Sequence, residues 1–159
     1  MVKSLVFKKN PAPLIKRIIA FFIDVLIIDI IIVMPFNKYI ESITNGQNGF
    51  SYFYSLVLKN PEVIFQLAIM SFIIFVLSVA YWSILEFKTR QSIGKMLMNI
   101  KVMSKKKGFS FTQCIVRNIS KPITILFLFD VLYMIFKKEK QRYFEKISDT
   151  AVVEEVLQI

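Results

Sequence analysis

Three apolar stretches alternate with polar and basic segments along the chain, and their lengths predict helices that enter a membrane. The first covers about residues 14–34 and the second about 63–86, each close to the roughly 20 residues that a membrane-spanning helix needs. The third, about 119–136, is shorter and contains Asp130. This third segment could cross once, or it could enter and return as a re-entrant element buried against the other helices. The pattern predicts an all-α membrane protein with two full transmembrane helices and a third, shorter segment.

The polar segments predict how a single membrane domain of residues 1–159 is oriented. Residues 35–60 contain the turn signals Asn45-Gly46 and Asn48-Gly49, and Asn60-Pro61 has the residue types of a helix start. The connection at 87–118 is basic, and from Phe87 to Lys121 there are nine Lys or Arg and no acid. Positive charge collects on the cytoplasmic side of membrane proteins. We therefore expect a cytoplasmic amino terminus, an extracytoplasmic loop at 35–60 and a cytoplasmic connection, in the cell membrane.

Local patterns inside the basic connection predict smaller elements. Residues 99–103 have the pattern of a short strand, and the capping box at 110–113 opens an amphipathic helix, about 111–121, that can lie at the membrane surface. Residues 150–153 also have the pattern of a strand, which could pair with residues 100–103. That pairing requires both strands on the cytoplasmic side, and it favours a cytoplasmic carboxy terminus over one outside.

Composition narrows the function classes. Hydrophobic residues make up 55% of the chain, above the roughly 45–50% of soluble domains. With one Cys and no His, the chain has no internal disulfide and no His or Cys cluster for zinc or copper. We expect Cys114 to be an apolar filler, and we expect no cofactor and no enzymatic activity. The net charge of +10 is explained by anionic lipid headgroups facing the basic connection, without nucleic acid.

Asp24 carries the strongest chemical signal, because a charge near the centre of a membrane helix costs about 2.5–3.5 kcal/mol on insertion scales. Arg17 and Ala20 share its helix stripe, but Arg17 lies roughly 10 Å away at about 1.5 Å per residue, too far for direct contact. We expect Arg17 to reach lipid phosphates and Asp24 to find a partner on another helix, such as Ser71, Ser78 or Tyr81. Asp29, about 140° around the helix, faces a different neighbour.

Two interpretations of these acids stay open. Asp24, helped by Asp29, Glu86 and Asp130, could form a cation or proton site, because burial and nearby cations shift carboxylate pKa values in opposite directions. Asp24 could equally be a hydrogen-bonded group that fixes helix packing. The Gly94-Lys95 pair lacks the upstream Gly of a phosphate-binding loop. We interpret it as an interfacial turn whose Lys contacts lipid headgroups.

Four motifs in order resemble the RDD family of membrane proteins and together cover nearly the whole chain. Arg17, Ala20 and Asp24 match its R-x-x-A-x-x-x-D helix, and Gly94 and Lys95 match its T-x-G-K segment, with Ser92 in place of a Thr-like residue. The remaining two matches are its R-N pair at Arg117 and Asn118, and its carboxy-terminal signature, which combines Q-R-x-x-D at Gln141, Arg142 and Glu145 with T-x-V-V from Thr150. Asp149 stands where the family usually has Gly. Either Glu145 or Asp130 could take the role of the family's second aspartate.

The resemblance implies a polytopic membrane protein, sometimes linked to transport. We expect transport of a small ion or solute, with exchange of a monovalent cation for protons as one form. We also expect an oligomer or partner membrane proteins, because two or three spans are few for an enclosed pathway. The alternative is a membrane scaffold or accessory subunit, whose intramembrane charges pair with partner helices and whose basic connection recruits a cytoplasmic protein.

Overall fold

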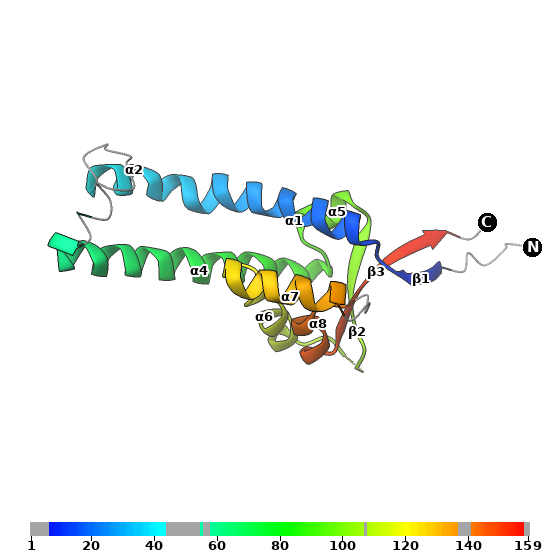
Figure 1. Ribbon diagram of the computed structural model, residues 1–159. Helices are drawn as coiled ribbons and strands as arrows, with labels where there is room; N and C mark the ends of the chain where they lie inside the picture. Colours follow the sequence, from blue (N-terminus) through cyan, green and yellow to red (C-terminus); the bar gives the residue numbers. More distant parts are fainter. Residues whose placement is uncertain (1–6, 44–54, 56–57, 107, 137–140, 158–159) are drawn as a thin grey trace, which may run out of the picture. The chain divides into compact units, whose positions relative to one another are not determined.

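The computed structural model describes residues 7–43, 55, 58–106, 108–136 and 141–157. The chain divides into two compact units: unit 1 comprises Met1–Val25 and Val79–Ile159, and unit 2 comprises Leu26–Ser78. Helices predominate, and a three-stranded sheet lies in unit 1 (Figure 1). Two helical stretches, Leu14–Tyr39 and Pro61–Thr89, are long and apolar enough to cross a membrane, with mean hydropathies of 2.7 and 2.6. The prediction of two long apolar helices is confirmed.

The first long helix continues beyond the residue where the sequence pattern placed its end. Helix α1, Leu14–Ile28, passes through a π-helical segment η1, Asp29–Val33, into α2, Met34–Ile43. The loop expected from Pro35 therefore starts later. The N–H of Met34 bonds to the carbonyl of Asp29, which widens the turn just before the proline. Such a turn relieves the clash that a proline ring makes inside a regular helix. The Asn-Gly turns expected at 45–49 lie outside the described residues.

Helix α4, Pro61–Thr89, begins at the proline of the expected start signal, and the N–H of Val63 bonds to the carbonyl of Asn60. In unit 2, the Ser78 hydroxyl bonds to the carbonyl of Ile74 in its own helix at 2.7 Å. This contact differs from the expectation that Ser78 partners Asp24. A Ser that bonds the carbonyl four residues earlier satisfies its hydroxyl inside an apolar helix.

The sheet of unit 1 connects the two ends of the described chain. Strand β3, Thr150–Leu157, lies between β1, Phe7–Pro11, and β2, Ile100–Ser104, and both pairings are antiparallel. Val102 is opposite Val152, and Pro11 is opposite Val153. Ala12, Ala20, Ile100 and Val152 form the apolar cluster beside the sheet. Strand β1 was not predicted, because Lys8, Lys9 and two prolines give that segment no alternation of apolar and polar positions.

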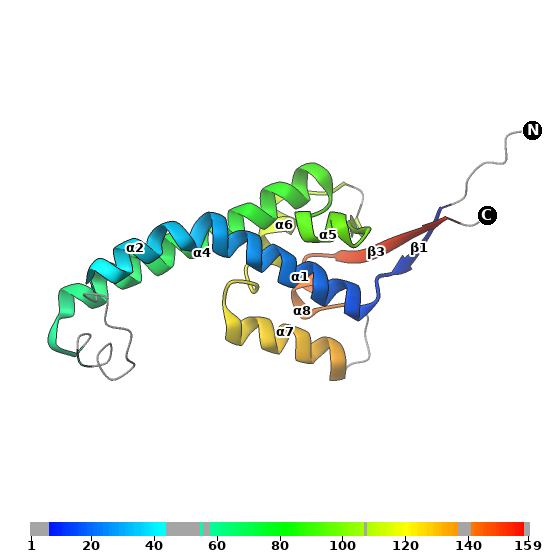
Figure 2. The same ribbon diagram turned by 90° about the horizontal axis from the view of Figure 1, so that it is seen from above.

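Four short helices complete unit 1: α5, Ile93–Leu97; α6, Phe111–Asn118; α7, Thr124–Phe136; and α8, Tyr143–Ile147. The capping box of Ser110 and Gln113 opens α6. Helix α7 begins five residues later than the expected 119 and has 13 residues, or about 20 Å at 1.5 Å per residue. This length is well short of the roughly 30 Å of a bilayer core. Helices α5 and α7 lie on different sides of the start of α1 (Figure 2).

Candidate functional site

Glu86, near the end of α4, is fully buried and gathers three cationic side chains. Arg117 Nε lies 2.9 Å from its Oε2, Lys121 Nζ lies 3.3 Å from its Oε1, and Lys95 also pairs with Oε1. The amide of Asn118 donates to Oε2 at 3.0 Å. One carboxylate thus connects α4, α5, α6 and the turn before α7. Buried charges need this kind of compensation, because removing one partner leaves the others uncompensated.

Glu145, in α8, is the second buried carboxylate and contacts three guanidinium groups. Arg17 Nη1 and Arg142 Nε each lie 3.2 Å from its oxygens, and Arg117 Nη2 lies at 3.4 Å. Burial alone would raise the pKa of Glu145, but the guanidiniums of Arg142, Arg117 and Arg17 lower it to about 2. Arg117 contacts both Glu86 and Glu145, so it joins the two clusters into one ion-pair network.

Asp130 extends this network to α7. Its carboxylate accepts from the backbone N–H of Phe144 at 3.0 Å and from the Ser120 hydroxyl at 3.1 Å, and Arg142 Nη1 lies 3.4 Å away. Glu145 is the carboxylate that Arg17 contacts, whereas Asp130 holds the start of α8 against α7. The two acids that the resemblance left as alternatives therefore both belong to the network, in different places.

Asp24 is held by neutral donors. Its carboxylate accepts from the backbone N–H of Gly94 at 2.8 Å, from the Ser92 hydroxyl at 2.5 Å, and from Tyr81 and Trp82 at 3.3 Å each. The expectation of a partner on another helix is met by Tyr81, and not by Ser71 or Ser78. Three further donors come from Trp82, from Ser92 directly before α5 and from Gly94 in α5.

Gly94 lets α5 approach α1 closely enough for these bonds. A Cβ at this position would lie 2.0 Å from the carbonyl oxygen of Ala20 and 3.1 Å from the Asp24 Cγ. Ala20 itself is 1% exposed. Ala20, Asp24 and Gly94, which belong to two separate motifs of the resemblance, therefore form a single contact between two helices.

Two basic residues that were expected at the membrane surface are buried in the structure. Arg17 donates to the carbonyl of Val152 at 2.9 Å and pairs with Glu145, and its side chain is 11% exposed. The Lys95 side chain is 9% exposed and pairs with Glu86. Asp29 lies in unit 2 and is exposed. Burying either cation without a partner would be costly, and the carboxylates of Glu145 and Glu86 provide that compensation.

The remaining motif residues support the sheet. The Gln141 amide donates to the carbonyl of Thr150 at 2.9 Å, and the Thr150 hydroxyl accepts from Arg117 at 3.2 Å. Asp149 has a φ of 51°, a left-handed conformation that explains why Gly is usual there.

Cys114 is fully buried in α6, and burial raises the pKa of its thiol to about 11.

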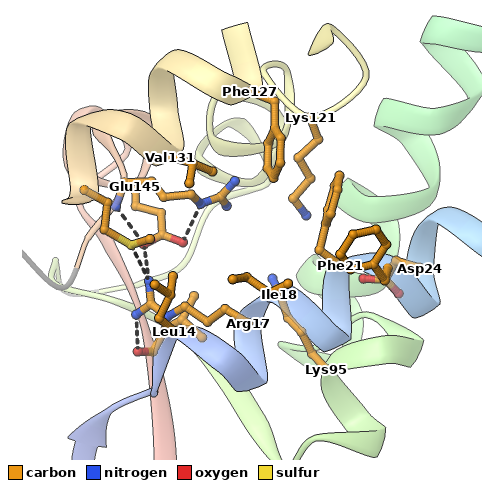
Figure 3. Close-up of a pocket in the computed structure, with 14 residues that line it drawn as sticks. Leu14, Arg17, Ile18, Phe21, Asp24, Lys95, Lys121, Phe127, Val131 and Glu145 are labelled. Atoms are coloured by element: carbon orange, nitrogen blue, oxygen red, sulfur yellow. Dashed lines mark hydrogen bonds and ion pairs between the residues drawn. The ribbon is translucent and has the colours of Figure 1, made fainter. Parts of the chain in front are cut away.

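A cavity of about 160 Å³ lies in unit 1 beside this network. Its polar lining comes from four cations and two carboxylates: Arg17, Lys95, Lys121, Arg142, Asp24 and Glu145. Its apolar lining is Leu14, Ile18, Phe21, Phe22, Phe127, Val131, Met134 and Val152. Lys95 and Lys121 point toward one another from opposite sides of this space (Figure 3). Burial lowers the pKa of Lys95 to about 8 and lowers that of Lys121 well below its ordinary value, although Glu86 opposes both shifts.

Lys121 was missed as a site residue because it sits directly before an apolar stretch, where a Lys usually marks the membrane interface. No local pattern indicated its role, because its partner Glu86 lies 35 positions away in the sequence.

A sequence model of the RDD family matches residues 11–149 of the chain. No curated protein and no solved structure matches it.

Proposed function

The chain belongs to the RDD family, and from this premise we propose that it moves a small ion or solute across the cell membrane, as an oligomer or with partner membrane proteins. The family and the two apolar helices indicate a membrane protein. The observation that carries the transport proposal is the cavity of unit 1, which combines a charged wall with an apolar wall. Polar groups that converge on an otherwise apolar cavity are typical of ligand sites.

The proposal includes a topology in which the amino terminus and the carboxy-terminal tail are both cytoplasmic. Strand β1 precedes the first long helix and β3 ends the described chain, and the two strands pair over five residue positions. Backbone pairing of this kind needs both strands on one side of the bilayer. The 13-residue length of α7 and its buried Asp130 and Met134 support a re-entrant or surface-packed third segment instead of a full span. The basic connection supports the cytoplasm as that side.

Cation and proton exchange at Asp24 is one form of this proposal. A carboxylate in a membrane protein can bind a cation or a proton at the same oxygens. Against this form, four donors already occupy the Asp24 carboxylate, and a cation would have to displace some of them. The arrangement supports helix packing as the role of Asp24 and leaves the cavity beside it as the ligand site.

Flux in proteoliposomes tests the proposal. Vesicles that contain the protein and a pH-sensitive dye receive pulses of Na⁺, K⁺ or small anions. The Asp24→Asn variant is compared with Asp29→Asn, which removes an exposed acid from the same long helix. Ion-dependent flux in the wild-type protein supports transport. Loss of cation-coupled proton flux in Asp24→Asn alone, with assembly intact, supports exchange at Asp24. Assembled protein without flux of any tested ion contradicts the transport proposal.

One observation favours the scaffold as a second candidate. Asp29 is exposed within the long apolar helix of residues 14–39, together with large apolar side chains such as Ile30 and Ile31 at 62% and 65% exposure. An acid at that depth can pair with a cationic or polar group of a partner helix. Under this alternative, Asp29→Asn lowers the yield of a cross-linked complex in membranes, while Asp24→Asn lowers folding and complex together.

A further inference from the structure

We propose that the cavity of unit 1 binds the anionic headgroup of a membrane phospholipid, with the acyl chain leaving along the apolar face of α1. The inference rests on the proposed function in taking this cavity as the binding site, and it names the ligand class. It departs from the expectation of a cationic ligand.

The sign of the charge around the cavity favours an anion. Four cationic side chains and two carboxylates line it, and one of those carboxylates, Asp24, is already occupied by four neutral donors. With Arg117, Glu86 and Asp130 added from behind the lining, five cations and four carboxylates lie in and around the cavity, so one positive charge is in excess. Uncompensated buried cations are costly, and a bound anion reduces that cost.

Three cations have donor capacity left for a ligand. The ammonium groups of Lys95 and Lys121 share a single oxygen, Oε1 of Glu86, and both point into the cavity (Figure 3). Each ammonium can donate three hydrogen bonds. The Nε of Arg17 is buried and has no hydrogen-bond partner among the residues that the structure describes. Phosphate oxygens accept several charge-assisted bonds at once, which suits this arrangement.

The apolar rim favours a lipid as the source of the anion. Leu14, Ile18 and Phe22 line the cavity at intervals of one helical turn and are 40%, 43% and 62% exposed. They belong to the long apolar helix, so the outer side of this rim faces lipid in a membrane. A volume of about 160 Å³ is far above the roughly 10–15 Å³ that one water needs, and it accommodates a headgroup phosphate. The exposed rim provides an apolar path for the chain.

Trp82 provides a direct reporter of binding, because the chain has one Trp. Lys121 Nζ lies 4.6 Å from the centre of the Trp82 ring, and Phe21 stacks on that ring. A phosphate that binds the Lys121 ammonium changes the interaction between that ammonium and the indole ring of Trp82. We therefore expect lipid binding to change the Trp82 fluorescence.

The test titrates the purified full-length protein in neutral detergent with short-chain phosphatidylglycerol, short-chain phosphatidylcholine and inorganic phosphate. We expect a saturable fluorescence change with phosphatidylglycerol alone. Lys121→Gln should weaken it by about tenfold or more, because a hydrogen bond to a charged group is lost. Lys106→Gln, which removes a 70% exposed cation, should leave it unchanged. Val131→Phe, which fills the cavity and keeps every charge, should weaken binding even if Lys121→Gln does not fold.

Several results would overturn the inference. Equal responses to both lipids would show apolar binding without recognition of the charge, and equal weakening by both Lys variants would show surface attraction. A response to phosphate as strong as that to phosphatidylglycerol would make the ligand a soluble anion. Binding without flux in proteoliposomes keeps this inference and rejects transport, whereas flux without lipid binding does the reverse.

Discussion

Gly94→Ala is expected to separate α5 from α1, because the new Cβ meets backbone. That atom would lie 2.0 Å from the Ala20 carbonyl oxygen and 2.9 Å from its carbonyl carbon. An ordinary C···O contact is about 3.3–3.6 Å, so one helix must move by about an ångström. Overpacking of this kind costs about 1–3 kcal/mol, and weakening the 2.8 Å bond from Gly94 N–H to Asp24 costs about 1.5–3 kcal/mol more. We expect a total loss of about 2.5–6 kcal/mol in the free energy of unfolding.

The measurement is SDS-induced unfolding in mixed micelles, followed by the fluorescence of Trp82, which itself donates to Asp24. Met96→Ala is the matched control, because Met96 lies in the same short helix and is 51% exposed. It should change stability by less than about 0.5 kcal/mol.

A double variant identifies the atom responsible. Ala20→Gly removes the Ala20 methyl group but leaves its carbonyl in place, so Ala20→Gly combined with Gly94→Ala should not recover stability. Recovery in the double variant, or a Gly94→Ala protein as stable as Met96→Ala, would refute the backbone contact.

Three further predictions concern the buried network. Glu86→Gln should lower the free energy of unfolding by about 3–5 kcal/mol because three cations lose their carboxylate, and adding Lys121→Gln should recover part of this loss. Glu62→Gln, which changes an exposed acid, is the control. Equal losses in the two Glu variants would contradict the role of Glu86. Glu145 has a pKa lowered from 4.5 to about 2, so its contribution, on the order of 3 kcal/mol, is present above pH 4.5 and is lost as the pH falls toward 2. Unfolding measured at pH 5 and pH 3 should show a smaller drop in Glu145→Gln, and an unchanged drop would reject this assignment. Cys114, buried and with its pKa raised to about 11, should react with maleimide only after unfolding in SDS, and fast labelling of the folded protein would contradict its burial.

Local patterns predicted those parts of the fold that depend on neighbouring residues. The start of α4 at Pro61 follows from the absence of an N–H in proline, and the capping box of Ser110 and Gln113 acts within four residues. The end of the first long helix was misplaced at Pro35, because a proline often ends or kinks a helix. In the structure the helix passes through a π-helical turn, from Asp29 to Val33, and continues into α2.

The sequence predicted which acids belong to the candidate site, but it did not predict which cations pair with them. The sequence pointed to Asp24, Glu86 and Asp130 as acids within or beside apolar stretches, and the resemblance added Glu145. Helix spacing predicted that Arg17 lies too far from Asp24 for direct contact, and in the structure Arg17 pairs with Glu145. It placed Arg17 and Lys95 at the membrane surface, because Arg17 lies near the start of an apolar stretch and Lys95 lies in the basic connection. Their actual partners, Glu145 and Glu86, could be chosen only when the fold placed buried carboxylates within reach of both cations.

The sequence by itself determined that this is a membrane protein with two long apolar helices, because hydrophobic length and helix signals act over a few neighbouring residues. Tertiary structure alone decided which charges meet, since Arg17 and Glu145 are 128 positions apart and Asp24 and Gly94 are 70 apart. A buried ion pair depends on distance and on the exclusion of water, and the chain has neither property until its distant segments pack. For the same reason, the cavity and its excess of positive charge exist only in the folded protein.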